Sequence, residues 1–229
     1  MSEGSTIRKT YKLYINGQFP RSESGRTFTA RDQSGKTVAH LCLASRKDFR
    51  DAVVAARSAQ KAWSARTAFN RGQILYRIAE MLQGRAQQFI DELVVQSALL
   101  SEAEFQVRES IDRLVYYAGW CDKYAALFSS VNPVTGSYFN FSVPEPTGVV
   151  ALIAPQQEGL LGLISVLAPC IAGGNTCVAL AAQSKPLSAI TLAEVLNSSD
   201  VPAGVVNILT GSLQELAPLL GNHMDVNAV

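Results

Sequence analysis

Three glutamines stand directly after two apolar runs, where their side chains could meet a ligand. Gln156 and Gln157 follow the run 148–154, and Gln183 follows the run 176–180. Both runs are short, apolar and rich in β-branched residues, which is typical of strands buried on both faces. Ligands of parallel sheets bind beyond the carboxyl ends of the strands. We therefore expect any ligand site in this chain to begin at these two loops.

Thiols and imidazoles are the other groups that could do chemistry. The chain has two histidines and four cysteines, namely His40, His223, Cys42, Cys121, Cys170 and Cys177. The cysteines lie in or near apolar segments without a Cys-x-x-Cys pair, so we interpret them as small core residues rather than nucleophiles. The histidines are too isolated for a metal site or a catalytic pair, and we expect no metal. Unpaired thiols are typical of a reducing compartment, which makes the cytoplasm our expectation.

Composition excludes several classes of protein. Apolar residues make up 48% of the chain and charged residues 17%, which argues against disorder and for a well-buried fold. A formal charge of +1 gives no reason to expect nucleic acid or an anionic membrane surface as a partner. The segment Met1–Ser5 is polar and does not resemble a signal peptide, and the apolar run 160–172 is too short to span a bilayer.

The first 43 residues predict a thin β-layer. Residues 11–15 alternate in polarity, and Asn16-Gly17 is a strong hairpin signal. Short extended segments are expected at 27–29 and 37–43, between turns that contain glycine. These segments are too polar for a core, so we expect them to lie on a larger body.

Three long helices should follow. Ser45, with Asp48 three residues later, predicts the start of the first helix, and Thr67 predicts the start of the second. The apolar stripe of the second continues through residues 89–94, so we expect one helix across that range. The third should run from about Ser101 to about residue 128. One apolar stripe on each helix indicates ordinary core packing.

The second half of the chain predicts a parallel sheet. Strands are expected at 148–154, 176–180 and 205–209, joined by helices over 159–172 and 186–196, with a further strand beginning at 226–229. A strand, a crossover helix and a parallel strand form the βαβ unit of a doubly wound sheet. Before this sheet, residues 137–143 alternate like a half-buried strand without an obvious hairpin partner, and such an edge could accept a strand of another chain.

Several motifs, in order and at matching spacing, resemble the aldehyde dehydrogenase superfamily. They are Tyr14–Phe19, Asp51–Arg57 with Trp63, Tyr116–Trp120, Glu145–Val150, Leu167–Thr176 and Pro202–Gly211. The resemblance implies an α/β fold: an aldehyde-dehydrogenase-like, incomplete doubly wound parallel sheet with an N-terminal β-layer and long helices. We expect residues 1–131 to form strands and helices, 132–147 a strand like the family's oligomerisation flap, and 148–229 part of a Rossmann-like NAD-binding domain.

The resemblance also implies where a site would lie. Members of the family oxidise aldehydes with NAD(P) through a cysteine, and a Pro-Trp-Asn-Phe-Pro turn supplies an asparagine amide to the oxyanion hole. Here that turn reads Pro155-Gln156-Gln157-Glu158-Gly159, so Gln157 stands at the asparagine position beside an acidic residue. The family's Lys-Pro-Ser-Glu, which binds the adenosine ribose, matches residues 180–183. By resemblance the cofactor positions are Ala154, Pro155, Gln156, Gln157, Leu180, Gln183 and Gly211.

These replacements lead to three hypotheses. In the first, the chain is a catalytically incomplete structural unit, similar to the degenerate second unit of aldehyde dehydrogenase family 16. It would bind itself or another aldehyde dehydrogenase chain through residues 137–143, and it would carry no cofactor alone. In the second, it is part of an NAD(P)-dependent aldehyde dehydrogenase whose cysteine, which the family places beyond the position of Val229, comes from elsewhere. A nucleotide-binding module without catalysis is the third.

Overall fold

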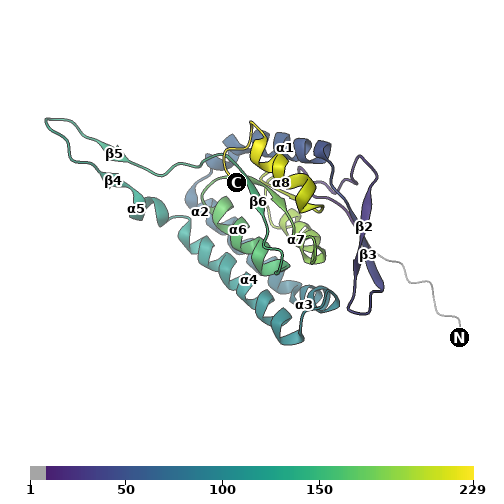
Figure 1. The fold of residues 1–229 in the computed structure, drawn as a ribbon. Coiled ribbons are helices and arrows are strands. Elements are labelled where there is room, and N and C mark those ends of the chain that lie inside the picture. The colour runs from purple at the N-terminus through teal and green to yellow at the C-terminus, as the bar shows by residue number, and fades with distance from the viewer. Residues whose placement is uncertain (1–8) are drawn as a thin grey trace, which may run out of the picture.

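A parallel three-stranded sheet forms the centre of the protein. The computed structural model describes residues 9–229 (Figure 1), so the predicted polar segment Met1–Ser5 lies outside the described residues. Strands β6 (Val149–Ile153), β7 (Thr176–Leu180) and β8 (Val206–Leu209) lie in the order β6-β7-β8, and both neighbouring pairs are parallel. Every residue of β7 and β8 is buried, which confirms the prediction of strands covered on both faces, whereas Val150, Leu152 and Ile153 of β6 are only partly buried.

The sheet continues beyond β6 and beyond β8. Ala228 forms a parallel bridge with Val150, and its carbonyl accepts a hydrogen bond from the amide of Ala151 at 2.9 Å. At the other edge Tyr14 pairs with Ile208 in antiparallel fashion. Along the chain, β7 and β8 follow on one side of β6, and residue 228 then pairs on its other side. This reversal of strand order is typical of a doubly wound sheet. The predicted extended segment at 226–229 lies at this position.

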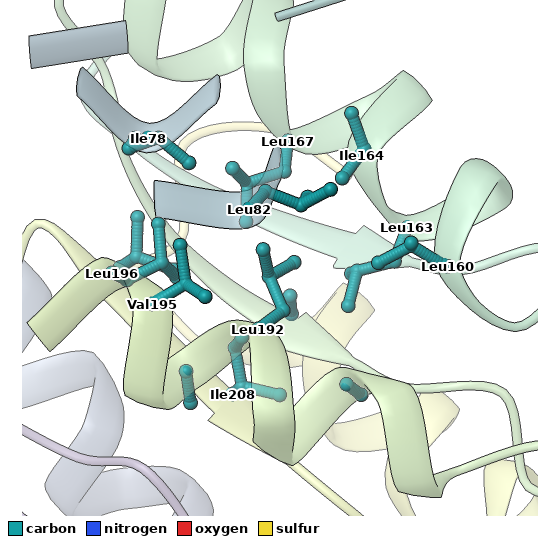
Figure 2. Close-up of a cluster of buried hydrophobic side chains, with 14 of the residues drawn as sticks. Ile78, Leu82, Leu160, Leu163, Ile164, Leu167, Leu192, Val195, Leu196 and Ile208 are labelled. Carbon is teal, nitrogen blue, oxygen red and sulfur yellow. The ribbon is translucent and has the colours of Figure 1, made fainter. Parts of the chain in front are cut away.

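Helices cover both faces of the sheet. Helices α6 (Leu160–Ala172) and α7 (Leu187–Asn197) share one buried cluster with Cys177, Ala179 and Ile208. Leucines and isoleucines of α6 and α7 meet Ile78 and Leu82 in this cluster (Figure 2). Helices α1 (Arg46–Ser64) and α8 (Leu213–Asn222) pack on the opposite face, where Val178, Leu180 and Leu209 are buried. Helix α1 begins as predicted, with a capping box of Ser45 and Asp48.

The outer helices correct two predictions. The second predicted helix is two, α2 (Ala68–Gly84) and α3 (Ala86–Val95), because Arg85 leaves helical geometry at φ −114° and ψ 16°. The third predicted helix also divides, into α4 (Leu100–Trp120) and the short α5 (Tyr124–Phe128). An apolar stripe can continue across the break at Arg85, because α2 and α3 bury the same side against the same core, whereas α5 buries none of its residues.

Three side chains cap the carboxyl end of α6. Trp63 Nε1 donates to the carbonyl of Ile171 at 3.1 Å, and Arg71 Nε donates to that of Ala172 at 3.1 Å. Asn175 Nδ2 donates to the carbonyl of Cys170 at 3.3 Å. The buried Arg71 is thus a cation at the negative end of a helix dipole. Gly174, at φ +85°, turns the chain towards β7.

The N-terminal layer holds the strands β1 (Thr10–Tyr11), β2 (Thr27–Arg31) and β3 (Thr37–Cys42) in the order β1-β3-β2. Asn16 and Gly17 form the predicted turn, with φ angles of 52° and 71°. The predicted strand 11–15 is divided: its start pairs with β3, and Tyr14 pairs with the central sheet. Residues 11–14 therefore join the N-terminal layer to the central sheet.

A third correction concerns residues 137–143. They have a hairpin partner in the chain, because β4 (Ser130–Val131) pairs with β5 (Phe141–Ser142) in antiparallel fashion. The predicted half-buried strand is exposed throughout and regular only at Phe141–Ser142. In Figure 1 this hairpin is an arm that extends away from the body beyond α5. Each of its strands has only two residues, which is too short for a pattern, so alternation alone did not identify the partner.

Candidate functional site

The two loops expected to hold a ligand are bonded to each other at the carboxyl edge of the sheet. The Gln156 side chain accepts a hydrogen bond from the amide of Gln183 at 2.9 Å and donates one to the carbonyl of Ala154 at 2.9 Å. The hydroxyl of Ser184 donates to the carbonyl of Gln156 at 2.6 Å. The amide group of Gln156 is thus used as an internal bridge between the loops that follow β6 and β7.

The predicted oxyanion-hole position lies in the same turn. Gln157 is exposed at the turn that follows Pro155, and Glu158 stands beside it. Gly162 of α6 lies beneath this turn, where an added Cβ would be 3.2 Å from both Glu158 Cβ and Pro155 Cδ. The turn is therefore packed on α6. An oxyanion donor works only when it is held at the position where charge develops, and a carboxylate nearby opposes that charge.

Gln183 also serves the fold. Its side-chain carbonyl accepts a hydrogen bond of 3.4 Å from the amide of Leu213, the first residue of α8. The first amides of a helix have no partner within the helix, so this contact helps to cap α8. Ser212 contributes in the same way by accepting from the amide of Glu215 at 3.4 Å. Both side chains thus cap the helix that starts at this edge of the sheet.

Leu180 and Gly211 complete the set of predicted cofactor positions. Leu180 is 2% exposed and packs in the core with Val178 and Leu209, and its carbonyl accepts from the amide of Ala154 at 3.0 Å. A Cβ added to Gly211 would lie 3.2 Å from Leu216 Cδ1 and 3.3 Å from the Ala44 amide nitrogen. The protein itself therefore occupies the approach to Gly211, and Leu180 has no group that could bind a ribose hydroxyl.

The residues at the expected positions do not fit a dinucleotide. The structure brings Ala154, Gln156, Leu180 and Gln183 together, but the side-chain amide of Gln156 and the side-chain carbonyl of Gln183 are paired with the protein. Of the two larger hollows described, one of about 630 Å³ lies between α2 and α4, and one of about 570 Å³ lies between α1 and α8. Neither is lined by the two loops. We therefore derive no chemical step through a nicotinamide cofactor.

Other reactive groups are buried or isolated. All four cysteines are buried and unpaired, as the sequence predicted, and burial raises the pKa of Cys121 to about 11. Across residues 9–229, no three His, Cys, Asp or Glu side chains gather closely enough to hold a metal ion. The same residues contain no helix whose length and hydropathy would allow it to cross a membrane.

One of the motifs that resemble the family, Pro202–Gly211, has a structural role. Asn207 is fully buried, and its Nδ2 donates to the carbonyls of Cys177 and Gly204 at 3.1 and 2.9 Å. Its Oδ1 accepts from the amide of Asn16 at 2.9 Å, which attaches the N-terminal turn to the sheet. Gly204 has φ +82°, and a Cβ there would lie 2.6 Å from the carbonyl oxygen of Ala55. The segment 202–207 thus joins three parts of the fold.

One buried carboxyl was missed by sequence reasoning. Glu92 of α3 is 9% exposed and accepts hydrogen bonds from Tyr11 and Thr191. Its position could have been found, because Phe89, Glu92, Leu93 and Gln96 share the spacing of one buried helical face. A charged residue at core spacing indicates a buried polar contact.

Comparison with known proteins agrees with the fold and its motifs. Residues 20–229 match the model of the aldehyde dehydrogenase family. The chain is 34% identical to mouse mitochondrial 10-formyltetrahydrofolate dehydrogenase over 97% of its own length and 25% of that protein. It is 32% identical to the human cytosolic 10-formyltetrahydrofolate dehydrogenase, again over about a quarter of that protein (26%).

Solved structures show the same relation. The chain superposes on an NAD+ complex of aldehyde dehydrogenase from Bacillus cereus with a TM-score of 0.90 and 27% identity, covering 95% of this chain and 45% of the other. An aldehyde dehydrogenase from Burkholderia cenocepacia gives a TM-score of 0.91 at 28% identity, with 45% of its length covered. The chain thus spans less than half of each of these relatives, and it belongs to the aldehyde dehydrogenase family.

Proposed function

We propose that this chain is a non-catalytic structural unit of the aldehyde dehydrogenase family that works in assembly. The observation that carries this proposal is the bridge made by Gln156 and Gln183. At the positions where the family would hold its cofactor, their amides join two loops and a helix instead. Leu180 is buried, and Gln157 stands beside Glu158. The bridge maintains the scaffold, and the residues at Leu180 and Gln157 lack contacts that the chemistry of the family requires.

The hairpin arm is the part of the chain that we assign to assembly. Val131, Phe139 and Phe141 are 70%, 74% and 57% exposed, and no charged residue occurs between Lys123 and Glu145. Exposed strand edges normally carry charges that discourage pairing. An uncharged apolar arm therefore fits strand addition by a second copy or by another aldehyde dehydrogenase chain through residues 137–143.

Two measurements test this proposal. Calorimetric titration with NAD and with NADP should give no binding, and an affinity in the micromolar range for either would overturn the non-catalytic role. Light scattering after size exclusion should give a mass above that of one 24.6 kDa chain. Phe141→Lys should reduce the mass to that of the monomer, whereas Val54→Lys, at a 56% exposed apolar residue on α1, should leave it unchanged. A wild-type monomer would count against assembly.

A second function is favoured by one observation. The close superposition on an NAD+ complex shows that the backbone of this half of the fold is kept, which suits a part of an NAD(P)-dependent aldehyde dehydrogenase whose cysteine is supplied elsewhere. Sequencing the native reading frame past Val229 distinguishes the two. A continuation with a family-like cysteine would favour the enzyme, and Gln157 would then be a modified oxyanion donor.

A further inference from the structure

A buried carboxyl joins three separate elements at one point. The Oε1 atom of Glu92 accepts a hydrogen bond of 2.9 Å from the Tyr11 hydroxyl of β1 and one of 2.7 Å from the Thr191 hydroxyl of α7. These partners lie 81 and 99 residues away in the chain. Glu92 therefore fixes the N-terminal strand and α7 to α3 through a single oxygen.

The second oxygen of the same carboxyl is unsatisfied. Oε2 of Glu92 is buried and has no hydrogen-bond partner among residues 9–229. A buried carboxylate oxygen without a donor is costly, and the neutral acid removes most of that cost. Burial accordingly raises the pKa of Glu92, although the hydrogen bonds from Thr191 and Tyr11 oppose the shift.

The charged groups around Glu92 are paired with one another. Glu194 of α7 forms ion pairs of 2.6 Å with Lys9, which precedes β1, and with Arg85 at the start of α3. Lys9 favours the charged form of Glu92 and Glu194 disfavours it. Burial and Glu92 raise the pKa of Tyr11 well above its usual value, so Tyr11 remains a donor. Burial thus raises the pKa of Glu92, whereas the ion pairs with Lys9 and Arg85 lower the pKa of Glu194, so Glu92 is the carboxyl of this cluster that keeps its proton to higher pH.

Strand β1 has few other attachments. It contains two residues, which pair with His40 and Leu41 of β3, so its docking depends strongly on the contacts of Tyr11 and Lys9. Opening of β1 would expose Glu92 to water and return its pKa towards the usual value. The docked state therefore binds a proton more tightly than the open state, and a rise in pH favours opening.

We propose that Glu92 is a proton-operated latch, which holds β1 on α3 and α7 while it is protonated and loosens that strand when it loses the proton. This role is independent of the proposed assembly function, because the N-terminal strands lie on the opposite side of the molecule from the hairpin arm (Figure 1). The docking of β1 on α3 and α7 would therefore depend on pH.

Hydrogen exchange with mass spectrometry tests the latch in the full chain. After correction for intrinsic rates, the protection of peptides that cover residues 9–15 should fall as the pH is raised above the ordinary glutamate pKa of about 4.3, by at most about tenfold per pH unit for one proton. Glu92→Gln keeps an acceptor for Tyr11 and Thr191 but cannot ionise, so its protection should not change with pH. Glu104→Gln, at an exposed glutamate of α4, should behave as wild type.

Two results would overturn the latch: a wild-type protection that does not vary with pH, or a pH dependence that persists in Glu92→Gln. If that variant fails to fold, Tyr11→Phe gives the decision. It removes one hydrogen bond that favours the carboxylate, so the loss of protection should begin at a higher pH than in wild type. An unchanged onset would show that Glu92 does not control the strand.

Discussion

Asn207→Asp replaces one nitrogen by an oxygen and should destabilise the protein in a way that depends on pH. The native Nδ2 donates to two carbonyl oxygens at 2.9 and 3.1 Å in a site with no exposure to solvent. Aspartate would place an acceptor there and lose both bonds, at about 1 kcal/mol each or more. It would also bury a charge without a partner, which costs about 3–5 kcal/mol.

The variant can avoid the charge by binding a proton. Protonation at pH 7 of a group with an ordinary pKa near 4 costs about 4 kcal/mol, so the loss at neutral pH should be about 4–7 kcal/mol. Because the proton restores one donor, the loss should shrink by about 1.4 kcal/mol per unit of pH as the solution is acidified. The pKa of the introduced carboxyl is higher in the folded than in the unfolded protein, so the variant loses stability as the pH rises above about 4.

Urea unfolding measures this loss. Trp63 is buried and reports unfolding by fluorescence, and each variant can be compared with wild type at about pH 7.5, 6.5 and 5.5. Asn222→Asp, at an exposed residue that ends α8, is the matched control and should lie within about 0.5 kcal/mol of wild type. A loss below about 1 kcal/mol for Asn207→Asp, or one that does not vary with pH, would refute the role assigned to Asn207.

Three further predictions concern other parts of the fold. Gly204→Ala should cost at least about 3 kcal/mol in urea unfolding, because the site has a positive φ and a carbonyl at 2.6 Å, whereas Gly221→Ala has open space and should be neutral or stabilising. Burial raises the pKa of Tyr14 to about 12, so its contribution to stability is complete below about pH 10 and is lost as the pH rises to 12. Tyr14→Phe should therefore reduce the alkaline loss of stability seen in urea titrations at about pH 8 and pH 11. The four buried thiols should react with Ellman's reagent only after unfolding; rapid reaction of the native protein would contradict their burial.

The central sheet was predictable because each of its elements carries a strong local signal. The runs at 148–154 and 176–180 are continuous and apolar, and Gly174 with Asn175 determines where α6 must end. The break at Arg85 left no such signal, because both flanking helices bury the same side. The partner of residues 137–143 was missed because that strand has only two residues, Ser130 and Val131, which is too short for a pattern of alternation.

The location of the two loops was predictable from the sequence, but the hydrogen bonds between them were not. The sequence located the loops after β6 and β7, since parallel strands end at one edge. It did not show that Gln156 joins them, because a glutamine that binds a ligand and one that binds a neighbouring loop are the same residue in the same position. The burial of Glu92 likewise depends on Tyr11 and Thr191, which are distant in the chain.

The contact between Asn16 and Asn207 has a consequence for synthesis. The two residues are 191 positions apart, and the N-terminal turn must wait for β8 before it gains that partner. Contacts of such long range slow folding, and apolar segments that wait are open to wrong associations. A growing chain would therefore expose Leu13 and Tyr14, both fully buried in the finished protein, for most of its translation. We expect slower elongation or added chaperone to change the yield of folded protein more than its final stability.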